Sequence, residues 1–210
     1  MKTSIKKICI LLFSPLFFVN CTIGQETGST AIEEKEPIEV VKERIQAFLE
    51  KDYSELGELL YEFEFKVKTD NLEDYEDGYI PWASLSDPKR DLPNLHNKNE
   101  IIIKYPQIKV MIDYPVTNIY EFNLKSKKGF TRAQLLSEIS KHYHLMYEEE
   151  EKTATIKTIP PAERTKMYNR NETNGRYGLW GHDISDMDIS GAMIYKNDKN
   201  EIIIVPFIES

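Results

Sequence analysis

The chain has 210 residues, of which 40% are hydrophobic and 11% aromatic, so it can form the packed core of one ordinary domain. This composition excludes a disordered chain. The formal net charge of −8 comes without a basic stripe, and an acidic surface repels phosphate backbones, so nucleic acid is not expected as a partner.

The first twenty residues have the composition of an export signal. Lys2, Lys6 and Lys7 give a positive start, and residues 8–19 form an apolar run of twelve residues. A helix that spans a bilayer needs roughly 20 apolar residues, so this run is too short for a permanent membrane span. Residues 1–20 are therefore predicted to be a cleaved signal peptide. Its loss removes three positive charges and changes the net charge from −8 to −11.

The sequence FVNC at residues 18–21 ends this signal. It resembles the lipobox of bacterial lipoproteins, in which the cysteine receives a diacylglycerol and becomes the new N-terminus. The strict motif has Ala or Gly where Asn20 stands, whereas the relaxed lipobox of spirochaetes tolerates Asn. The resemblance implies lipid attachment, including palmitate, at Cys21, which is the only cysteine of the mature chain. The alternative is ordinary cleavage after Gly24, which would release a soluble periplasmic or secreted protein.

The mature chain divides into three predicted parts. Residues 21–36 are small and charged and form a flexible tether. Residues 37–98 form an N-terminal segment of helices and one strand, with a long loop at 70–99 that contains Trp82. Residues 99–210 form an α+β domain.

Within residues 37–98, apolar residues at helical spacing predict a first helix that begins at Pro37 and runs to about residue 49. Asp52 and Glu55 resemble a capping box that opens a second short helix through Leu60. Alternating residues at 63–67 predict a half-buried strand. Trp82 is expected to pack onto the core from the loop, and a loop of this length indicates either a functional loop or an element that the pattern does not reveal.

Strands are predicted in the C-terminal domain at residues 101–103, 108–114, 119–124, 189–195 and 201–208. A capping box of Thr131 and Gln134 opens the longest helix, which runs to about residue 151. The acidic run at 148–151 is expected to be a solvated helix end rather than a metal cluster. These elements predict an α+β fold: a mostly antiparallel sheet with one long helix packed across a face, preceded by short N-terminal helices.

The most distinctive segment is GRYGLWGHD at residues 175–183. Together with Gly-Phe-Thr at 129–131, it resembles a family of uncharacterised proteins that share a Gly-Phe-Thr helix opening and a Gly-x-Tyr-Gly-x-Trp-Gly-His-Asp segment. The resemblance covers roughly the last 80 to 110 residues and implies a domain but no activity. The three glycines predict a compact turn that leads into the C-terminal hairpin, with Trp180 buried in the core.

His182 is a candidate for catalysis, as a general base oriented by Asp183 or Asp186. Because adjacent residues on an extended chain point to opposite faces, Asp186 is the better partner. The simpler interpretation is that His182 and Asp183 bond to backbone groups in the turn. His142 and His144 diverge by about 200° around a helix and do not share a metal ion. The acidic residues at 183, 186 and 188 lack the pattern of a calcium loop. No metal and no cofactor is expected.

Three functions are compatible with these patterns. The first is a non-catalytic binding or interaction domain, lipid-anchored to a membrane of the bacterial cell envelope, with the outer membrane as the expected location and an unknown protein or small molecule as its partner. The second is a hydrolase that uses His182 with a nearby carboxylate. The third is a structural component of the envelope that assembles through an exposed sheet edge.

Overall fold

The structure, a computed structural model, describes residues 51–165 and 171–210. The predicted signal peptide, Cys21, the tether and the predicted helix at 37–49 lie outside the described residues. Lys51–Ser210 form one compact unit. Its class is α+β, as predicted: a six-stranded sheet, two small sheets and one long helix.

The main sheet is mixed, with the strand order β1-β9-β10-β6-β7 and β4 paired to β9. Its strands are β1 (Glu58–Glu64), β4 (Ala83–Ser84), β6 (Gln107–Ile112), β7 (Tyr120–Lys125), β9 (Asp188–Lys196) and β10 (Ile202–Glu209). Only β10 and β6 run parallel among the pairs of this described sheet. The sheet is thus mostly antiparallel, as predicted, with one parallel pair that the sequence pattern did not reveal. β1 and β4 precede the boundary predicted between residues 98 and 99, yet both pair with β9 beyond it.

Two small sheets and several short helices complete the described residues. β2 (Val67–Lys68) pairs with β3 (Tyr79–Ile80), and β5 (Ile101–Ile103) pairs with β8 (Phe130–Thr131). The short helices are α2 (Pro88–Asp91) and the 3₁₀ turns η1 (Ser54–Leu56), η2 (Leu92–Asn94), η3 (Pro161–Glu163) and η4 (Ile184–Asp186). The predicted loop at 70–99 therefore contains β3, β4, α2 and η2. Trp82 is half-buried and packs edge-on against Tyr75 in this region, with 6.3 Å between the ring centroids.

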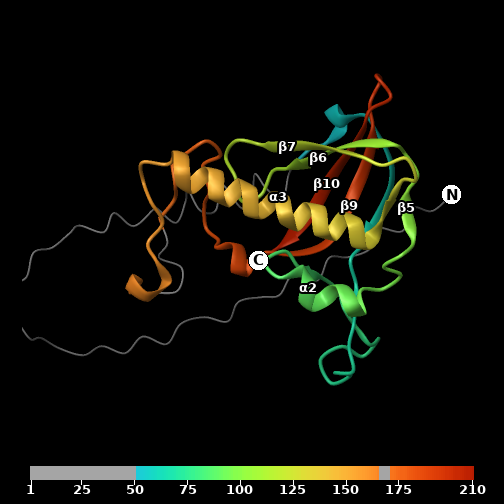
Figure 1. Cartoon of the computed structure of the whole chain (residues 1–210), viewed down its shortest axis with the longest axis horizontal. Coiled ribbons are helices and arrows are strands. Elements are labelled where there is room, and N and C mark those ends of the chain that lie inside the picture. Colours follow the sequence, from blue (N-terminus) through green and yellow to red (C-terminus); the bar gives the residue numbers. More distant parts are fainter. Residues whose placement is uncertain (1–50, 166–170) are drawn as a thin grey trace, which may run out of the picture. The chain divides into compact units, whose positions relative to one another are not determined.

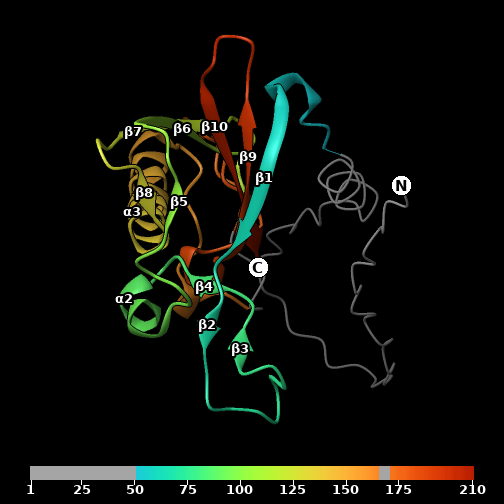
Figure 2. The ribbon, with the colours of Figure 1, turned by 90° about the vertical axis from the view of Figure 1, so that its right-hand side faces the viewer.

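The long helix α3 (Arg132–Thr153) lies along one face of the main sheet (Figures 1 and 2). The predicted capping box opens it: the Thr131 hydroxyl accepts from the backbone N–H of Gln134, whose side chain accepts from the N–H of Thr131. The apolar stripe of α3 faces the sheet and is fully buried at Leu135, Leu136, Ile139, Tyr143 and Met146. The Tyr143 hydroxyl donates a hydrogen bond of 2.8 Å to the carbonyl of Tyr114, which joins the helix to the residues after β6.

The predicted second helix at 52–60 is wrong beyond its first turn. The predicted capping box of Asp52 and Glu55 is absent: Tyr53 is the N-cap residue, Asp52 accepts only from Ser54, and the helical turn ends at Leu56. Leu59 and Leu60 belong to β1, where Leu59 lies opposite Tyr195 of β9. Gly57 has a φ of +106°, and a Cβ there would lie 2.3 Å from the carbonyl oxygen of Lys196, so this residue turns the chain onto the hairpin. Strand pairing overrides the helical spacing of the leucines.

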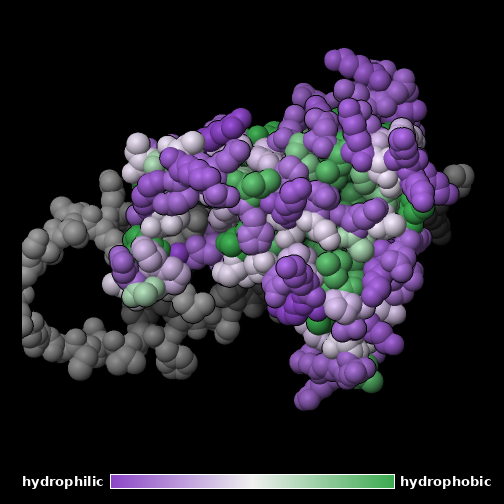
Figure 3. All heavy atoms as spheres, viewed as in Figure 1, coloured by the Kyte–Doolittle hydropathy of each residue, from purple (hydrophilic) through white to green (hydrophobic). Residues whose placement is uncertain are grey.

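The C-terminal hairpin agrees with the sequence pattern. β9 and β10 pair along their length, and the turn between them has Asn200 at a φ of +61°. Hydrophilic residues dominate the face shown in Figure 3, with small hydrophobic patches between them. Within the described residues, no helix combines the length and the hydrophobicity that crossing a bilayer requires.

The fold predicts a large cost for truncating the centre of the buried helix face. Ile139 is fully buried, so Ile139→Ala should lower the free energy of unfolding by about 2–5 kcal/mol. Leu145→Ala is the matched control, because Leu145 lies on the same helix with 38% of its surface exposed and should cost less. Denaturant unfolding of both variants measures the difference. Equal stability of Ile139→Ala and the unsubstituted protein would contradict the assignment of this face.

Candidate functional site

Glu150 is a buried carboxylate in the last turn of α3, with 1% of its surface exposed. Its Oε1 accepts hydrogen bonds from the Thr173 hydroxyl at 2.6 Å and from the backbone N–H of Gly175 at 2.7 Å. Its Oε2 accepts from the backbone N–H of Tyr177 at 2.7 Å. The C-terminal end of a helix disfavours an anion, so these charge-assisted bonds offset both the burial and the helix dipole. They fasten residues 173–177 to the end of α3.

The acidic run at 148–151 is therefore not a uniformly solvated helix end, and that expectation was wrong for Glu150. Glu148 is exposed and pairs with Lys152. Glu150, however, follows Met146 by four residues and Tyr143 by seven, which places it on the buried stripe of α3. The helical spacing could have predicted that Glu150 is buried, but its charge made an exposed position look more plausible.

The pKa of Glu150 is lowered by its hydrogen bonds. Burial alone would raise the pKa, but the bonds from the Thr173 hydroxyl and from the backbone N–H groups of Tyr177, Gly175 and Gly178 together bring it below its usual range. The carboxylate is thus ionised and tightly bound. It is a weak base in this setting.

Two glycines of the segment are required by this arrangement. A Cβ on Gly175 would lie 2.7 Å from both carboxylate oxygens of Glu150. These oxygens are held by their hydrogen bonds and cannot move away without breaking them. Gly178 has a φ of +65°, in the left-handed region, and a Cβ there would also crowd the Thr117 side chain at 3.1 Å.

After this turn the chain pairs with the residues that precede β7. Leu179 forms a bridge with Val116, Thr117 donates its N–H to the carbonyl of Tyr177 at 3.0 Å, and Trp180 donates to the carbonyl of Pro115 at 3.1 Å. Tyr177 and Leu179 point inward and are 6% and 2% exposed.

Trp180 is half-buried, so the prediction that it is buried in the core was wrong. Neighbouring residues on an extended chain face opposite sides, so burial of Tyr177 and Leu179 turns Trp180 outward. Its ring packs edge-on against Tyr114, with 5.0 Å between the centroids.

His182 lies at the end of this segment beside the C-terminus. Its ring is half-buried, 5.7 Å from the Tyr114 ring, and its Nε2 lies 3.4 Å from the Oγ of Ser210. Its backbone carbonyl accepts a hydrogen bond of 2.9 Å from the Tyr147 hydroxyl on α3. The histidine is thus fixed through its backbone by the same helix that carries Glu150.

The carboxylates of Asp183 and Asp186 are engaged in structural contacts. Asp183 accepts two hydrogen bonds from the guanidinium of Arg164, one of them between Nη2 and Oδ1 at 3.0 Å. Asp186 accepts from the N–H of Asp183 at 3.1 Å, and from the hydroxyl of Ser185 at 3.1 Å. Together they form a capping box for η4. The carboxylate of Asp183 is thus occupied by Arg164, and that of Asp186 by the N–H of Asp183 and the hydroxyl of Ser185.

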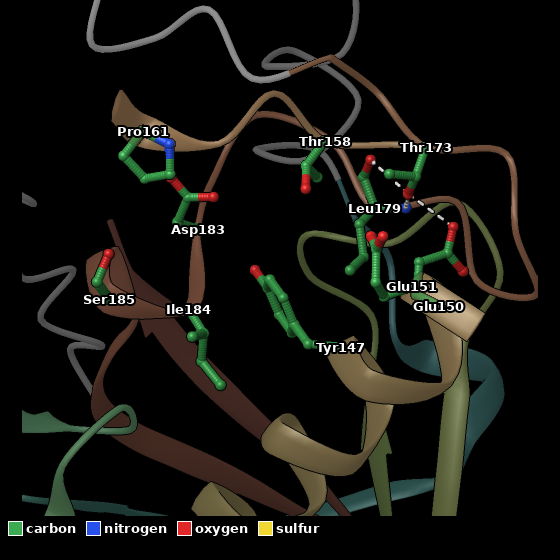
Figure 4. A pocket seen from close by; sticks show the side chains of 10 residues that line it. All are labelled: Tyr147, Glu150, Glu151, Thr158, Pro161, Thr173, Leu179, Asp183, Ile184 and Ser185. Atoms are coloured by element: carbon green, nitrogen blue, oxygen red, sulfur yellow. Dashed lines mark hydrogen bonds between the residues drawn. The ribbon is translucent and has the colours of Figure 1, made fainter. Parts of the chain in front are cut away.

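A pocket of about 360 Å³ lies between the end of α3, η3 and η4 (Figure 4). Tyr147 of α3 points into it, and Leu179 and Ile184 give it apolar walls. The remaining lining residues are Glu150, Glu151, Thr158, Pro161, Thr173, Asp183 and Ser185. His182 is not one of the lining residues. The sequence patterns did not predict this pocket, because its walls come from four separate stretches of the chain.

The other candidate residues lie apart from one another. His142 stacks on Phe122, with 3.6 Å between ring centroids, and its Nδ1 lies 2.8 Å from the Tyr120 hydroxyl. The Nε2 of His144 instead contacts the carbonyl of Ser86 at 3.0 Å. The two side chains therefore point to different neighbours, as their spacing predicts. Among the described residues, no group of three or more His, Cys, Asp or Glu could hold a metal ion.

No protein-family model, no curated protein and no solved structure matches this chain. The site is thus defined by its own geometry: a glycine-rich segment fixed to the end of a helix by a buried carboxylate, beside a small pocket with polar and apolar walls.

The contacts of Glu150 predict a specific loss of stability. Glu150→Gln replaces one acceptor oxygen with a donor that faces N–H groups, so it should lower the free energy of unfolding by about 2–4 kcal/mol at neutral pH. Glu148→Gln is the matched control: it loses only an exposed ion pair with Lys152 and should shift the unfolding midpoint far less. Denaturant unfolding measures both.

The stability difference between the unsubstituted protein and Glu150→Gln should depend on pH in a defined direction. Because the pKa of Glu150 is lowered on folding, its stabilisation is present above the pKa of the unfolded chain, about 4.3, and is lost as the pH falls through the folded-state pKa. The gap in unfolding free energy between the unsubstituted protein and Glu150→Gln should therefore narrow below about pH 4. A gap that stays constant down to low pH would show that the charge of Glu150 contributes nothing.

Proposed function

We propose that the protein is a lipid-anchored domain of the bacterial cell envelope that binds a partner and has no catalytic activity. The anchor would be the lipid on Cys21, with residues 21–36 as a tether that leaves the folded unit free of the membrane surface. The acidic mature chain disfavours nucleic acid as the partner, and a protein or small molecule remains the expected ligand.

The observation that carries this proposal is that the carboxylates on and around the glycine-rich segment make structural contacts. Glu150, Asp183 and Asp186 each accept hydrogen bonds that hold the chain in place. A general base needs a pKa near the working pH, whereas the pKa of Glu150 is lowered by its contacts. Carboxylates that hold the chain in place are suited to a rigid binding scaffold, and they are poorly suited to proton transfer.

The pocket beside Tyr147 is the proposed ligand site. Leu179 and Ile184 would contact an apolar part of the ligand, while Thr158 and Ser185 would offer hydroxyl groups to its polar part. Glu151 and Asp183 line the same pocket and disfavour an anionic ligand. The volume of about 360 Å³ is at the lower end of the range for small-molecule sites, so it suits a small ligand or one side chain of a protein partner.

The second candidate is a hydrolase that uses His182. One contact favours it: the Nε2 of His182 lies 3.4 Å from the hydroxyl of Ser210, which is longer than a normal hydrogen bond but within reach of a small movement. A carboxylate would have to orient the imidazole, and Asp183 already accepts two bonds from Arg164. The binding function therefore remains the main proposal.

Lipid attachment predicts the outcome of metabolic labelling with a fatty-acid analogue. The unsubstituted protein should incorporate the label, and Cys21→Ala should lose it, because the thiol at residue 21 is the acceptor. Cys9→Ala is the matched control and should retain the label, since Cys9 lies in the predicted signal peptide. A label that survives in Cys21→Ala, or a mature protein that begins after Gly24, would rule out this anchor.

His182→Gln separates the two candidate functions. Gln keeps one hydrogen-bonding group but cannot titrate, so a binding domain should retain its partner, and a hydrolase should lose turnover while it stays folded. Capture of partners from membranes and hydrolysis of ester and peptide substrates are measured on the same variant, together with its thermal unfolding. Loss of hydrolysis with unchanged unfolding would reject the non-catalytic proposal.

A large side chain placed in the pocket tests whether the pocket binds the partner. Ser185→Trp places a large ring at the rim of the pocket and should abolish capture of the partner. Ser137→Trp is the control, because Ser137 is exposed on α3 and does not line the pocket. Equal capture by both variants would place the partner elsewhere on the surface.

A further inference from the structure

The main sheet ends at β1 on one side and at β7 on the other. In the described part of the chain, β1 pairs with β9 alone and β7 pairs with β6 alone. Each therefore presents backbone N–H and C=O groups along its outer edge that the sheet does not use. Such an edge can pair with another strand unless its shape or its charges prevent it.

β7 lacks two of the features that protect an edge, a bulge and a proline, although it carries the charged residues Glu121 and Lys125. Its ladder with β6 runs through six consecutive residue pairs without a register shift, and it contains no proline. Its side chains alternate strictly: Tyr120 and Phe122 are buried on the side of α3, whereas Glu121, Asn123 and Lys125 are exposed on the other side. On the buried side, the His142 ring stacks on Phe122, with 3.6 Å between the ring centroids. A straight, regular edge of this kind accepts an added strand.

The charges of β7 are complementary when two copies of the strand pair antiparallel. We propose that a second copy of this chain adds antiparallel to β7, with Asn123 of the two copies opposite each other on a two-fold axis. This register places Glu121 opposite Lys125 of the second copy, and Lys125 opposite its Glu121. Phe122 then faces Leu124 of the second copy on the helix side. Opposite charges and apolar pairs across strands both stabilise a sheet.

β1, at the other edge of the sheet, is irregular and carries charges that oppose pairing with itself. Its pairing with β9 shifts register between Leu59 and Tyr61, which bends the strand. Antiparallel pairing of β1 with itself around Tyr61 would place Glu58 opposite Glu64, and like charges in that position are destabilising. This pairing of β1 is therefore disfavoured, whereas the pairing of β7 with itself is favoured. A two-fold contact through one edge closes after two copies, so the product is a dimer and not a fibre.

This dimer does not rest on the proposed function, because neither the pocket nor His182 takes part in it. It would join two β7 edges into one continuous sheet of twice the width. Leu145 of α3, 38% exposed, follows His142 by one helical turn and would lie near the junction, where it offers an apolar contact to the second copy.

A cross-linking experiment tests the position of the axis. The full-length protein carrying Asn123→Cys is treated with a short bis-maleimide reagent and separated on a denaturing gel. Because opposite residues of an antiparallel pair have Cβ atoms about 4.5–5.5 Å apart, this variant should appear as a covalent dimer. Glu62→Cys, at an exposed position of β1, and the unsubstituted protein are the controls and should remain monomeric. A dimer from Glu62→Cys but none from Asn123→Cys would overturn the proposal.

A charge exchange tests the register. Glu121→Lys and Lys125→Glu each turn two opposite-charge pairs into like-charge pairs, so each should raise the dissociation constant at least about tenfold. The double variant restores both pairs and should return the dissociation constant to that of the unsubstituted protein. Sedimentation equilibrium of the purified full-length protein measures the constants, and thermal unfolding verifies that each variant is folded. A protein that stays monomeric throughout, or single variants that associate normally, would reject this interface.

Discussion

The carboxylate of Glu150 occupies a position that is unfavourable for an anion, buried at the C-terminal end of a 22-residue helix. It remains ionised there because the chain at residues 173–177 brings a hydroxyl and backbone N–H groups to it. Each partner therefore depends on the other. Without the loop the carboxylate would be buried and unpaired, and without the carboxylate the N–H groups of the loop would lose their acceptor, which is costly in a buried setting.

The rest of the C-terminal half follows from this contact. Once Tyr177 is fixed, the residues up to Trp180 can pair with those at 115–117, and Tyr147 can hold the carbonyl of His182. The chain then passes through η4 into β9, which is central in the sheet because it pairs with β1, β4 and β10. The end of α3 thus positions both the wall of the pocket and the strand that organises the sheet.

The sequence predicted the parts of this fold that depend on local pattern. The α3 helix has a strong period and a capping box, and the hairpin of β9 and β10 has a turn rich in Asn and Asp, so both were recognisable. Features that depend on distant contacts were not. Leu59 and Leu60 have helical spacing, but pairing with β9 makes them a strand, and the acidic character of Glu150 concealed its place on the buried stripe. The burial of Glu150 depends on hydrogen-bond donors at Thr173 and Tyr177, more than twenty residues away, and no local sequence pattern predicts such contacts.

The same contact limits the chemistry that the segment can perform. If Glu150 took up a proton, one acceptor oxygen would become a donor facing N–H and O–H groups, and the loop would lose part of its attachment. Proton transfer at this residue is therefore coupled to loosening of the structure that carries His182 and Asp183. Asp183 is similarly committed, because its release from Arg164 would free the chain around η3. Carboxylates that must stay ionised to hold the backbone are suited to a scaffold of fixed shape. Variation in function is then expected in the exposed lining of the pocket and along the open strand edge, where side chains can change without breaking these contacts.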